Sequence, residues 1–180
     1  PRDWSSDVCS SDLQASRALS LVSHCASGTW VTVLLALVAF SLWRHAWFFH
    51  DDAYITLRYA RHLVTLGEPV WNPGEWVEGY SSMLHLALLA AAGKLLGVQG
   101  SGWMAVARGL NAAAALTLVA ACGHAAHVLT RGDGLGRRVA LLVLAASAPL
   151  WVWLLGGLEA VLAAAWVSLA RSEEHTSELQ

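Results

Sequence analysis

The apolar residues of this chain are gathered into long blocks, and most of the charged residues lie between them. Four blocks run over about residues 29–49, 82–96, 103–129 and 139–155, and a fifth begins near Leu158. Blocks of this composition are typical of membrane spans, where only a helix satisfies every backbone amide. A soluble helical domain would need amphipathic stripes, which these blocks lack. We therefore expect an all-α fold, a polytopic transmembrane helical bundle.

Both ends of the chain differ in composition from this apolar centre. The tail RSEEHTSELQ (171–180) can be encoded by a short DNA segment whose complementary strand, in another frame, encodes the head sequence WSSDVCSSD and the start of a leucine codon. Such a pair is typical of a translated sequencing adapter, so we set residues 1–13 and 171–180 aside. Residues 14–170 then hold nine basic and seven acidic residues, and the formal net charge changes from −2 to +2.

The first loop carries the densest group of charged and aromatic residues. Arg17 is the only fixed positive charge that precedes the first span, so the positive-inside rule places residues 50–81 outside the cytoplasm. The segment from Asp51 to His62 is too polar to cross the membrane, and its pattern predicts a helix that lies along the membrane interface. Its polar stripe is expected to hold six residues at helical spacing, namely Asp51, Asp52, Ile55, Arg58, Tyr59 and His62. A turn is expected at Asn72–Gly74.

The adjacent acids Asp51 and Asp52 have two interpretations. They can cap the helix that they begin, because carboxylates stabilise the positive end of a helix dipole. They can also belong to a charged site beside the lipid headgroups, with Arg58 and the loop glutamates. The spacing alone leaves both open.

Three sequence segments together resemble the start of a known enzyme family. They are an apolar span that ends in an aspartate pair, the segment DDAYITLRYARHL (51–63), and WNPGEWVEGYSS (71–82) before an Ala- and Leu-rich helix. This order is similar to the N-terminal part of the GT-C glycosyltransferases. It is nearest to terminal arabinofuranosyltransferase-like members and to the RgtA/B/C/D-like, ArnT and protein mannosyltransferase group. The segment GLEAVLAAAWVSLA, from residue 157, is a weaker match.

The resemblance implies a multi-pass enzyme of the bacterial cytoplasmic membrane with its active site on the extracytoplasmic face. Such an enzyme takes a sugar from a polyprenyl-phosphate donor and transfers it to a cell-envelope glycan or lipid acceptor. The attacking hydroxyl must lose its proton, and a carboxylate is a suitable general base. We therefore expect Asp51 to be the base and Asp52 its orienting partner. Because relatives have many more spans, residues 14–170 are expected to be an inactive N-terminal fragment.

Further site residues follow from the resemblance and from side-chain chemistry. Asp52 and Glu78 are candidate ligands of a divalent cation, and oxygen ligands favour Mg, Mn or Ca. Arg58 is expected to contact the carrier phosphate or to pair with an aspartate, and Arg61 to anchor in lipid headgroups. Tyr59 and Tyr80 are candidate sugar contacts.

The later spans pose a question of topology. Arg131, Arg137 and Arg138 follow the third block and should be cytoplasmic, whereas two full crossings from the first loop would place them outside. We therefore favour a second block, 82–96, that enters the membrane without crossing it. The chain then returns outside near residue 157 and brings Glu159 close to the aspartate pair, where relatives keep another acidic residue.

Two other functions are compatible with such a chain. A transporter or channel would place acids within spans and break helices in paired halves. A nonenzymatic membrane assembly subunit would use Ala-rich helices for close packing. Because the acids cluster in one loop and the spans are nearly free of them, we favour the enzyme. The few scattered basic residues do not indicate nucleic-acid binding.

Overall fold

The structure, a computed structural model, describes residues 28–131 and 134–177. The predicted all-α class is confirmed for these residues. A first helix, Gly28–His45, is followed by six more: α2 (Asp51–Leu66), α3 (Met83–Leu95), α4 (Gly102–Leu129), α5 (Gly134–Ala146), α6 (Ala148–Gly156) and α7 (Ala160–Ser177). The expected adapter segment 1–13 lies outside the described residues, and α7 continues into the tail segment to Ser177.

Two described helices are long and apolar enough to cross a membrane, Gly28–His45 and α4, with mean hydropathies of 1.2 and 1.6. A third candidate is the bent pair α5 and α6. The predicted block 82–96 is the helix α3, whose 13 residues fall short of the ~20 that a span needs. The described residues therefore hold two or three candidate membrane-spanning helices.

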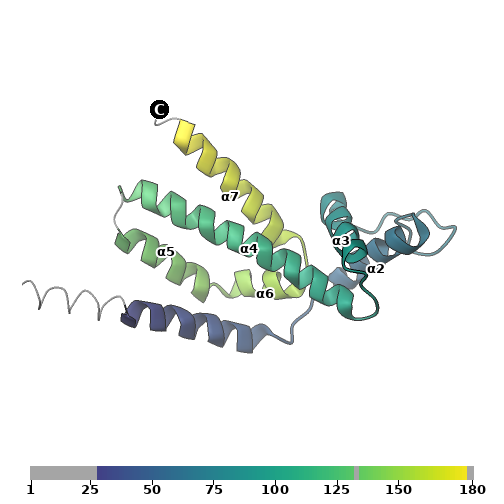
Figure 1. Cartoon of the computed structure of the whole chain (residues 1–180), viewed down its shortest axis with the longest axis horizontal. Coiled ribbons are helices and arrows are strands. Elements are labelled where there is room, and N and C mark those ends of the chain that lie inside the picture. Colours follow the sequence, from purple (N-terminus) through teal and green to yellow (C-terminus); the bar gives the residue numbers. More distant parts are fainter. Residues whose placement is uncertain (1–27, 132–133, 178–180) are drawn as a thin grey trace, which may run out of the picture.

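The helices separate into a long bundle and a cap at one of its ends. The first helix, α4, α5 and α7 extend to one side of Figure 1, whereas α2 and α3 lie together at the other side, beside the start of α4. The end of α4 and the start of α5 lie at the opposite end from the cap (Figure 1), with Arg131 closely following α4 and Arg137 and Arg138 in α5. α3 thus lies at the same end as α2, and the second block that enters without crossing stays a prediction.

The block predicted as a span over 139–155 is a bent pair of helices and not one continuous helix. α5 and α6 meet at 58° around Ser147. Pro149 lies at the start of α6, where a proline is tolerated because the first amides of a helix need no intrahelical partner. The break frees the carbonyl of Ala145, which accepts hydrogen bonds from Trp151 Nε1 at 2.8 Å and from Ser41 Oγ of the first helix at 3.3 Å. These bonds stabilise the bend.

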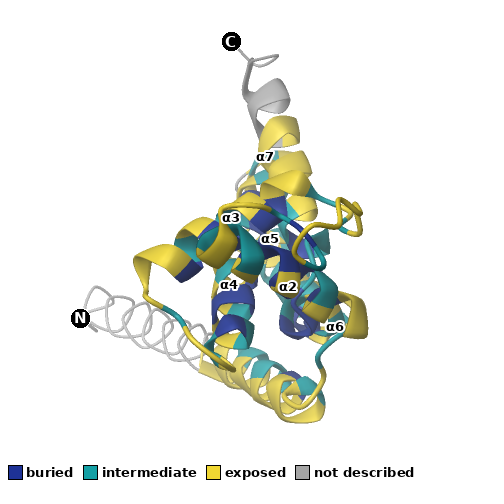
Figure 2. Ribbon diagram, turned by 90° about the vertical axis from the view of Figure 1, so that its right-hand side faces the viewer, coloured by how far each residue is buried: buried dark blue, intermediate teal, exposed yellow. Residues whose placement is uncertain are grey.

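Two apolar cores hold the helices together, and buried positions gather where the elements cross (Figure 2). The first core joins the cap to the start of α4 and includes Leu57, Leu89 and Trp103. Gly93 of α3 packs directly on the Trp103 ring, which leaves no space for a Cβ. The second core joins α4 to α7 through five buried residues, Ala114, Ala115, Leu118, Val161 and Ala165. The first core holds α2 in place, and with it Asp51 and Asp52 at the start of that helix.

Candidate functional site

The helix that carries the aspartate pair is capped by the residue before it. His50 is in an extended conformation, and its Nδ1 accepts a hydrogen bond from the Asp52 amide at 3.2 Å. The prediction that Asp51 and Asp52 cap this helix is therefore wrong, because the N-cap residue is His50. Asp51 and Asp52 occupy the exposed first turn, where their negative charges interact favourably with the positive end of the helix dipole. Asp52 Oδ2 lies 3.5 Å from His50 Nδ1.

The start of α2 is fixed by the turn between α6 and α7. The His50 amide donates to the Gly156 carbonyl at 3.0 Å, and its imidazole stacks on Trp153 with ring centroids 5.9 Å apart. Gly157 ends α6 with a φ of 83°, and a Cβ there would overlap the Phe49 ring. A glycine is required for both reasons. The turn that leads to Glu159 thus lies against the segment that leads to Asp51, in agreement with the expected return of the chain.

The polar face of α2 differs from the predicted stripe. Asp51, Tyr54, Arg58 and Arg61 are all exposed and are separated by three or four residues, so they share one face. Tyr59, which was predicted on that stripe, is only 1% exposed and packs into the core. The face therefore runs through Tyr54 and Arg61 rather than through Ile55 and Tyr59.

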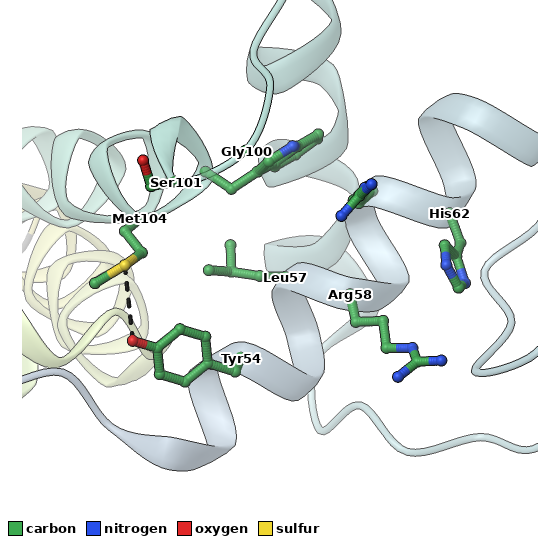
Figure 3. A pocket seen from close by; sticks show the side chains of 9 residues that line it. Tyr54, Leu57, Arg58, His62, Gly100, Ser101 and Met104 are labelled. Atoms are coloured by element: carbon green, nitrogen blue, oxygen red, sulfur yellow. Dashed lines mark hydrogen bonds between the residues drawn. The ribbon is translucent and has the colours of Figure 1, made fainter.

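This face borders a polar pocket of about 570 Å³ between α2 and the connection from α3 to α4. Figure 3 shows Tyr54, Leu57, Arg58 and His62 on α2, opposite Ser101 and Met104. Arg61 and Trp103 complete the α2 and α4 walls. The Tyr54 hydroxyl donates to the Met104 sulfur at 3.7 Å across the pocket mouth. Arg58 and His62 turn their polar groups to the loop, since the Arg58 guanidinium donates to Trp71 and Asn72 and His62 Nδ1 lies 2.7 Å from the Val70 carbonyl. Arg61 is therefore the cation of this cavity best placed to receive an anionic group.

Arg58 forms no ion pair with an aspartate among the described residues, and its contact with the carrier phosphate stays a prediction. Its Nε donates to the Trp71 carbonyl at 3.0 Å, its Nη2 donates to Asn72 Oδ1 at 3.0 Å, and the guanidinium lies 4.1 Å from the centre of the Trp71 ring. The expected Asn72–Gly74 turn is confirmed, since the Glu75 amide donates to the Asn72 carbonyl at 3.1 Å and Gly74 has a φ of 85°. Arg58 therefore holds this loop against α2.

Arg61 has a different environment from Arg58. Its side chain is exposed, and its guanidinium forms no hydrogen bond or ion pair with any residue that the structure describes. The structure therefore leaves its donors available to a ligand in the pocket, while Arg58 has fewer donors left.

Tyr59 and Tyr80 pack on each other at the base of the loop. Their rings meet edge to face with centroids 5.3 Å apart, and the Tyr59 hydroxyl donates to the Val77 carbonyl at 2.7 Å. A Cβ on Gly79 would lie 2.9 Å from that hydroxyl. Tyr59 is therefore a packing residue in this structure, and the half-buried Tyr80 is the better placed of the two for a sugar contact.

Glu159 joins the loop to α3 and α7 through two contacts. Ser81 Oγ donates to Glu159 Oε1 at 2.6 Å, and Glu159 Oε2 lies 3.9 Å from Nδ1 of the buried His85. Both His85 ring nitrogens are buried without a hydrogen-bond partner among the described residues. Desolvation by burial lowers the pKa of His85, and the Glu159 carboxylate opposes this shift without reversing it.

The lowered pKa predicts a pH dependence of stability. Because the folded state disfavours the imidazolium, the unfolded chain binds more protons as the pH falls below the ordinary histidine pKa of about 6.5. The free energy of unfolding should therefore decrease between about pH 7.5 and 5.5. His85→Leu should show a weaker decrease over the same range. Denaturation titrations of both proteins at several pH values measure the difference, and parallel curves would contradict the assignment.

The predicted metal ligands do not come together. Asp52 lies beside His50, and Glu78 is exposed in the loop. Within residues 28–131 and 134–177, no three His, Cys, Asp or Glu side chains are placed to hold one metal ion. Asp52 and Glu78 stay predictions as ligands.

With the geometry described, the chain was compared with known proteins. No protein family, curated protein sequence or solved structure matches it. The assignment of a function therefore rests on the residues themselves.

Two polar residues of α4, Arg108 and Asn111, make contacts that were not predicted from the sequence. Arg108 Nε donates to the Leu155 carbonyl at 3.2 Å, and its Nη2 donates to the carbonyls of Ala46 and Phe48, each at 3.0 Å. Asn111, 1% exposed, donates from Nδ2 to three carbonyls near the end of α6, those of Trp153, Leu154 and Leu158. The signal was present, because polar residues inside an apolar helix need a partner or a role.

Proposed function

We propose that this chain forms part of a membrane glycosyltransferase of the GT-C type, which transfers a sugar from a polyprenyl-phosphate donor to a cell-envelope acceptor. The observation that carries the proposal is the single polar face of α2. An exposed carboxylate, Asp51, stands at one end of this face, and the pocket with Arg58 and Arg61 follows it. A base and an anion site along one helix are what transfer from a lipid-linked phosphate requires.

Asp51 is suited to be the base. It is exposed and forms no hydrogen bond or ion pair with the described residues, so its oxygens are free to accept a proton. The acceptor hydroxyl gives this proton to Asp51 as its oxygen bonds to the anomeric carbon. The bond from that carbon to the carrier phosphate breaks, and the phosphate leaves with the electron pair. Asp52, whose side chain is also exposed, is assigned the orienting role.

The arrangement at the two ends of the bundle supports an extracytoplasmic site. α4 ends and α5 begins at the opposite end from α2 (Figure 1), and the basic residues Arg137 and Arg138 belong to the start of α5 while Arg131 closely follows α4. The positive-inside rule places this basic end in the cytoplasm. The aspartate pair then lies on the outer face of the bacterial inner membrane, where polyprenyl-linked sugars are used.

One observation bears on the transporter alternative. The break between α5 and α6 is a discontinuous helix, and transporters coordinate ions with the free carbonyls of such helices. Here the carbonyl of Ala145 at the break accepts hydrogen bonds from Trp151 Nε1 and from Ser41 Oγ. These donors occupy the groups that an ion would need, so the enzyme remains our proposal.

Binding of the carrier alone tests the anion site. Arg61→Gln should weaken the affinity of polyprenyl phosphate about tenfold, because it removes charge-assisted hydrogen bonds to the phosphate. Arg61 is the residue to change because Arg58 also holds the loop. Titration of the purified protein with polyprenyl phosphate, followed by intrinsic tryptophan fluorescence, measures the affinity.

The matched control is Arg44→Gln. Arg44 is exposed at the end of the first helix, and the α2 pocket does not include it. It should bind the carrier within about twofold of the wild type, since loss of one distant exposed charge changes binding little. Equal affinities for Arg61→Gln and the wild type would remove the α2 pocket as the phosphate site.

A further inference from the structure

A second polar pocket lies at the end of the bundle away from α2. It has a volume of about 410 Å³ and is formed by the first helix, α4 and α5. Its polar lining consists of His124 and His127 of α4 and Arg137 of α5, with Trp30 of the first helix beside them. Imidazole N–H groups donate in either protonation state, and guanidinium is always charged. The described lining residues include no acid, so the pocket favours an anion.

The position of its arginine is unfavourable for α5 alone. Arg137 lies in the first turn of α5, a helix that has no acidic residue there. A cation at this end is repelled by the positive helix dipole. Arg138 follows and lies 5.8 Å from the centre of the Trp30 ring. An anion near Arg137 would be attracted both by the guanidinium and by the positive end of the helix dipole.

The surroundings of the pocket point to a lipid headgroup. Its walls continue into apolar residues, Val119 and Leu141, of the helices that form the bundle. Trp30 has a buried indole N–H without a hydrogen-bond partner among the described residues, and tryptophan is typical of the membrane interface. Basic pockets between helices at the cytoplasmic end bind anionic lipid headgroups.

We propose that this pocket binds the phosphodiester group of an anionic phospholipid. Arg137 contacts the phosphate oxygens, while His124 and His127 donate from the opposite wall. The acyl chains lie along the apolar side of α4 and α5. This site is separate from the proposed catalytic end and does not depend on it.

Lipid retention tests the site directly. The 180-residue chain is placed in nanodiscs with equal amounts of phosphatidylglycerol and phosphatidylcholine, and native mass spectrometry measures the lipids that stay bound. The wild type should retain phosphatidylglycerol preferentially. Arg137→Gln should reduce this retention about fivefold, since one basic residue near an anionic lipid contributes about 1 kcal/mol.

Two further variants distinguish lipid binding in the pocket from nonspecific attraction by positive charge at this end of the bundle. Arg131→Gln removes the same charge from the same end, outside the pocket lining, and should leave retention unchanged. Gly123→Val keeps the charge but fills space, because a Cβ at Gly123 lies 4.0 Å from Arg137 Cγ. It should reduce retention as Arg137→Gln does. Circular dichroism confirms that each variant keeps its helices.

Three results would overturn the proposal. Equal retention of the two lipids by the wild type would show that the pocket does not select an anion. An equal loss in Arg131→Gln would show that charge at this end, and not the pocket, attracts the lipid. Displacement of phosphatidylglycerol by millimolar inorganic phosphate would show that the pocket takes a small free anion instead of a lipid headgroup.

Discussion

Asp51→Asn should lower sugar transfer by roughly 10²–10⁴-fold, which is the usual contribution of a general base. The amide keeps the size of the carboxylate but cannot accept the proton of the acceptor hydroxyl. The helix should persist, because His50 caps it and one first-turn charge contributes only about 0.3–1 kcal/mol. The rate is measured with labelled polyprenyl-phosphate sugar in membranes that express the protein carrying residues 14–170, at matched protein levels.

Two carboxylate controls accompany this variant. Glu68→Gln changes an exposed acid just beyond α2 and should leave the rate unchanged. Asp52→Asn should reduce the rate less than Asp51→Asn does, because Asp52 is proposed to orient the site and not to accept the proton. A normal rate in Asp51→Asn would remove Asp51 as the base, and an equal loss in Glu68→Gln would show that the effect is not specific.

Arg108→Leu should lower the free energy of unfolding by about 3 kcal/mol. The change removes three hydrogen bonds from a charged group and leaves the carbonyls of Ala46, Phe48 and Leu155 without their donor. These bonds tie the end of the first helix and the end of α6 to α4, so their loss should also loosen the segment before Asp51. Unfolding by SDS titration, followed by circular dichroism, measures the change.

Arg44→Leu is the matched control for this prediction. It removes the same charge from an exposed position near the same end of the bundle. Its unfolding midpoint should stay close to that of the wild type. If the two variants unfold at the same SDS fraction, the hydrogen bonds of Arg108 do not hold the three segments together.

Local composition predicted much of the fold. The first helix and α4 were expected at 29–49 and 103–129, and they lie at Gly28–His45 and Gly102–Leu129. Runs of apolar residues with good helix propensity determine such elements without help from distant contacts. The break at Ser147 was missed because an apolar block was treated as continuous in spite of Pro149. Proline in such a block marks a boundary.

The candidate site was predicted in part. The sequence indicated a polar helix with Asp51 and Arg58 on its polar face, but it placed Arg61 away from that face. It also assigned Tyr59 to the polar face and the cap to the aspartates. Which side of α2 is buried depends on α3 and α4, which pack on it only in the folded chain. The bonds of Arg108 and Asn111 span 42 to 62 residues, and no local pattern specifies such partners.

The most direct test of the proposed enzyme is acceptor-dependent transfer by the wild-type protein. Membranes that express the protein carrying residues 14–170 are supplied with polyprenyl phosphate bearing a labelled pentose, hexose or uronic acid, with and without cell-envelope acceptor. We expect one of these sugars to move to the acceptor, with release of polyprenyl phosphate. If none of the labelled donors is consumed beyond the level in membranes that lack the protein, the glycosyltransferase proposal is contradicted.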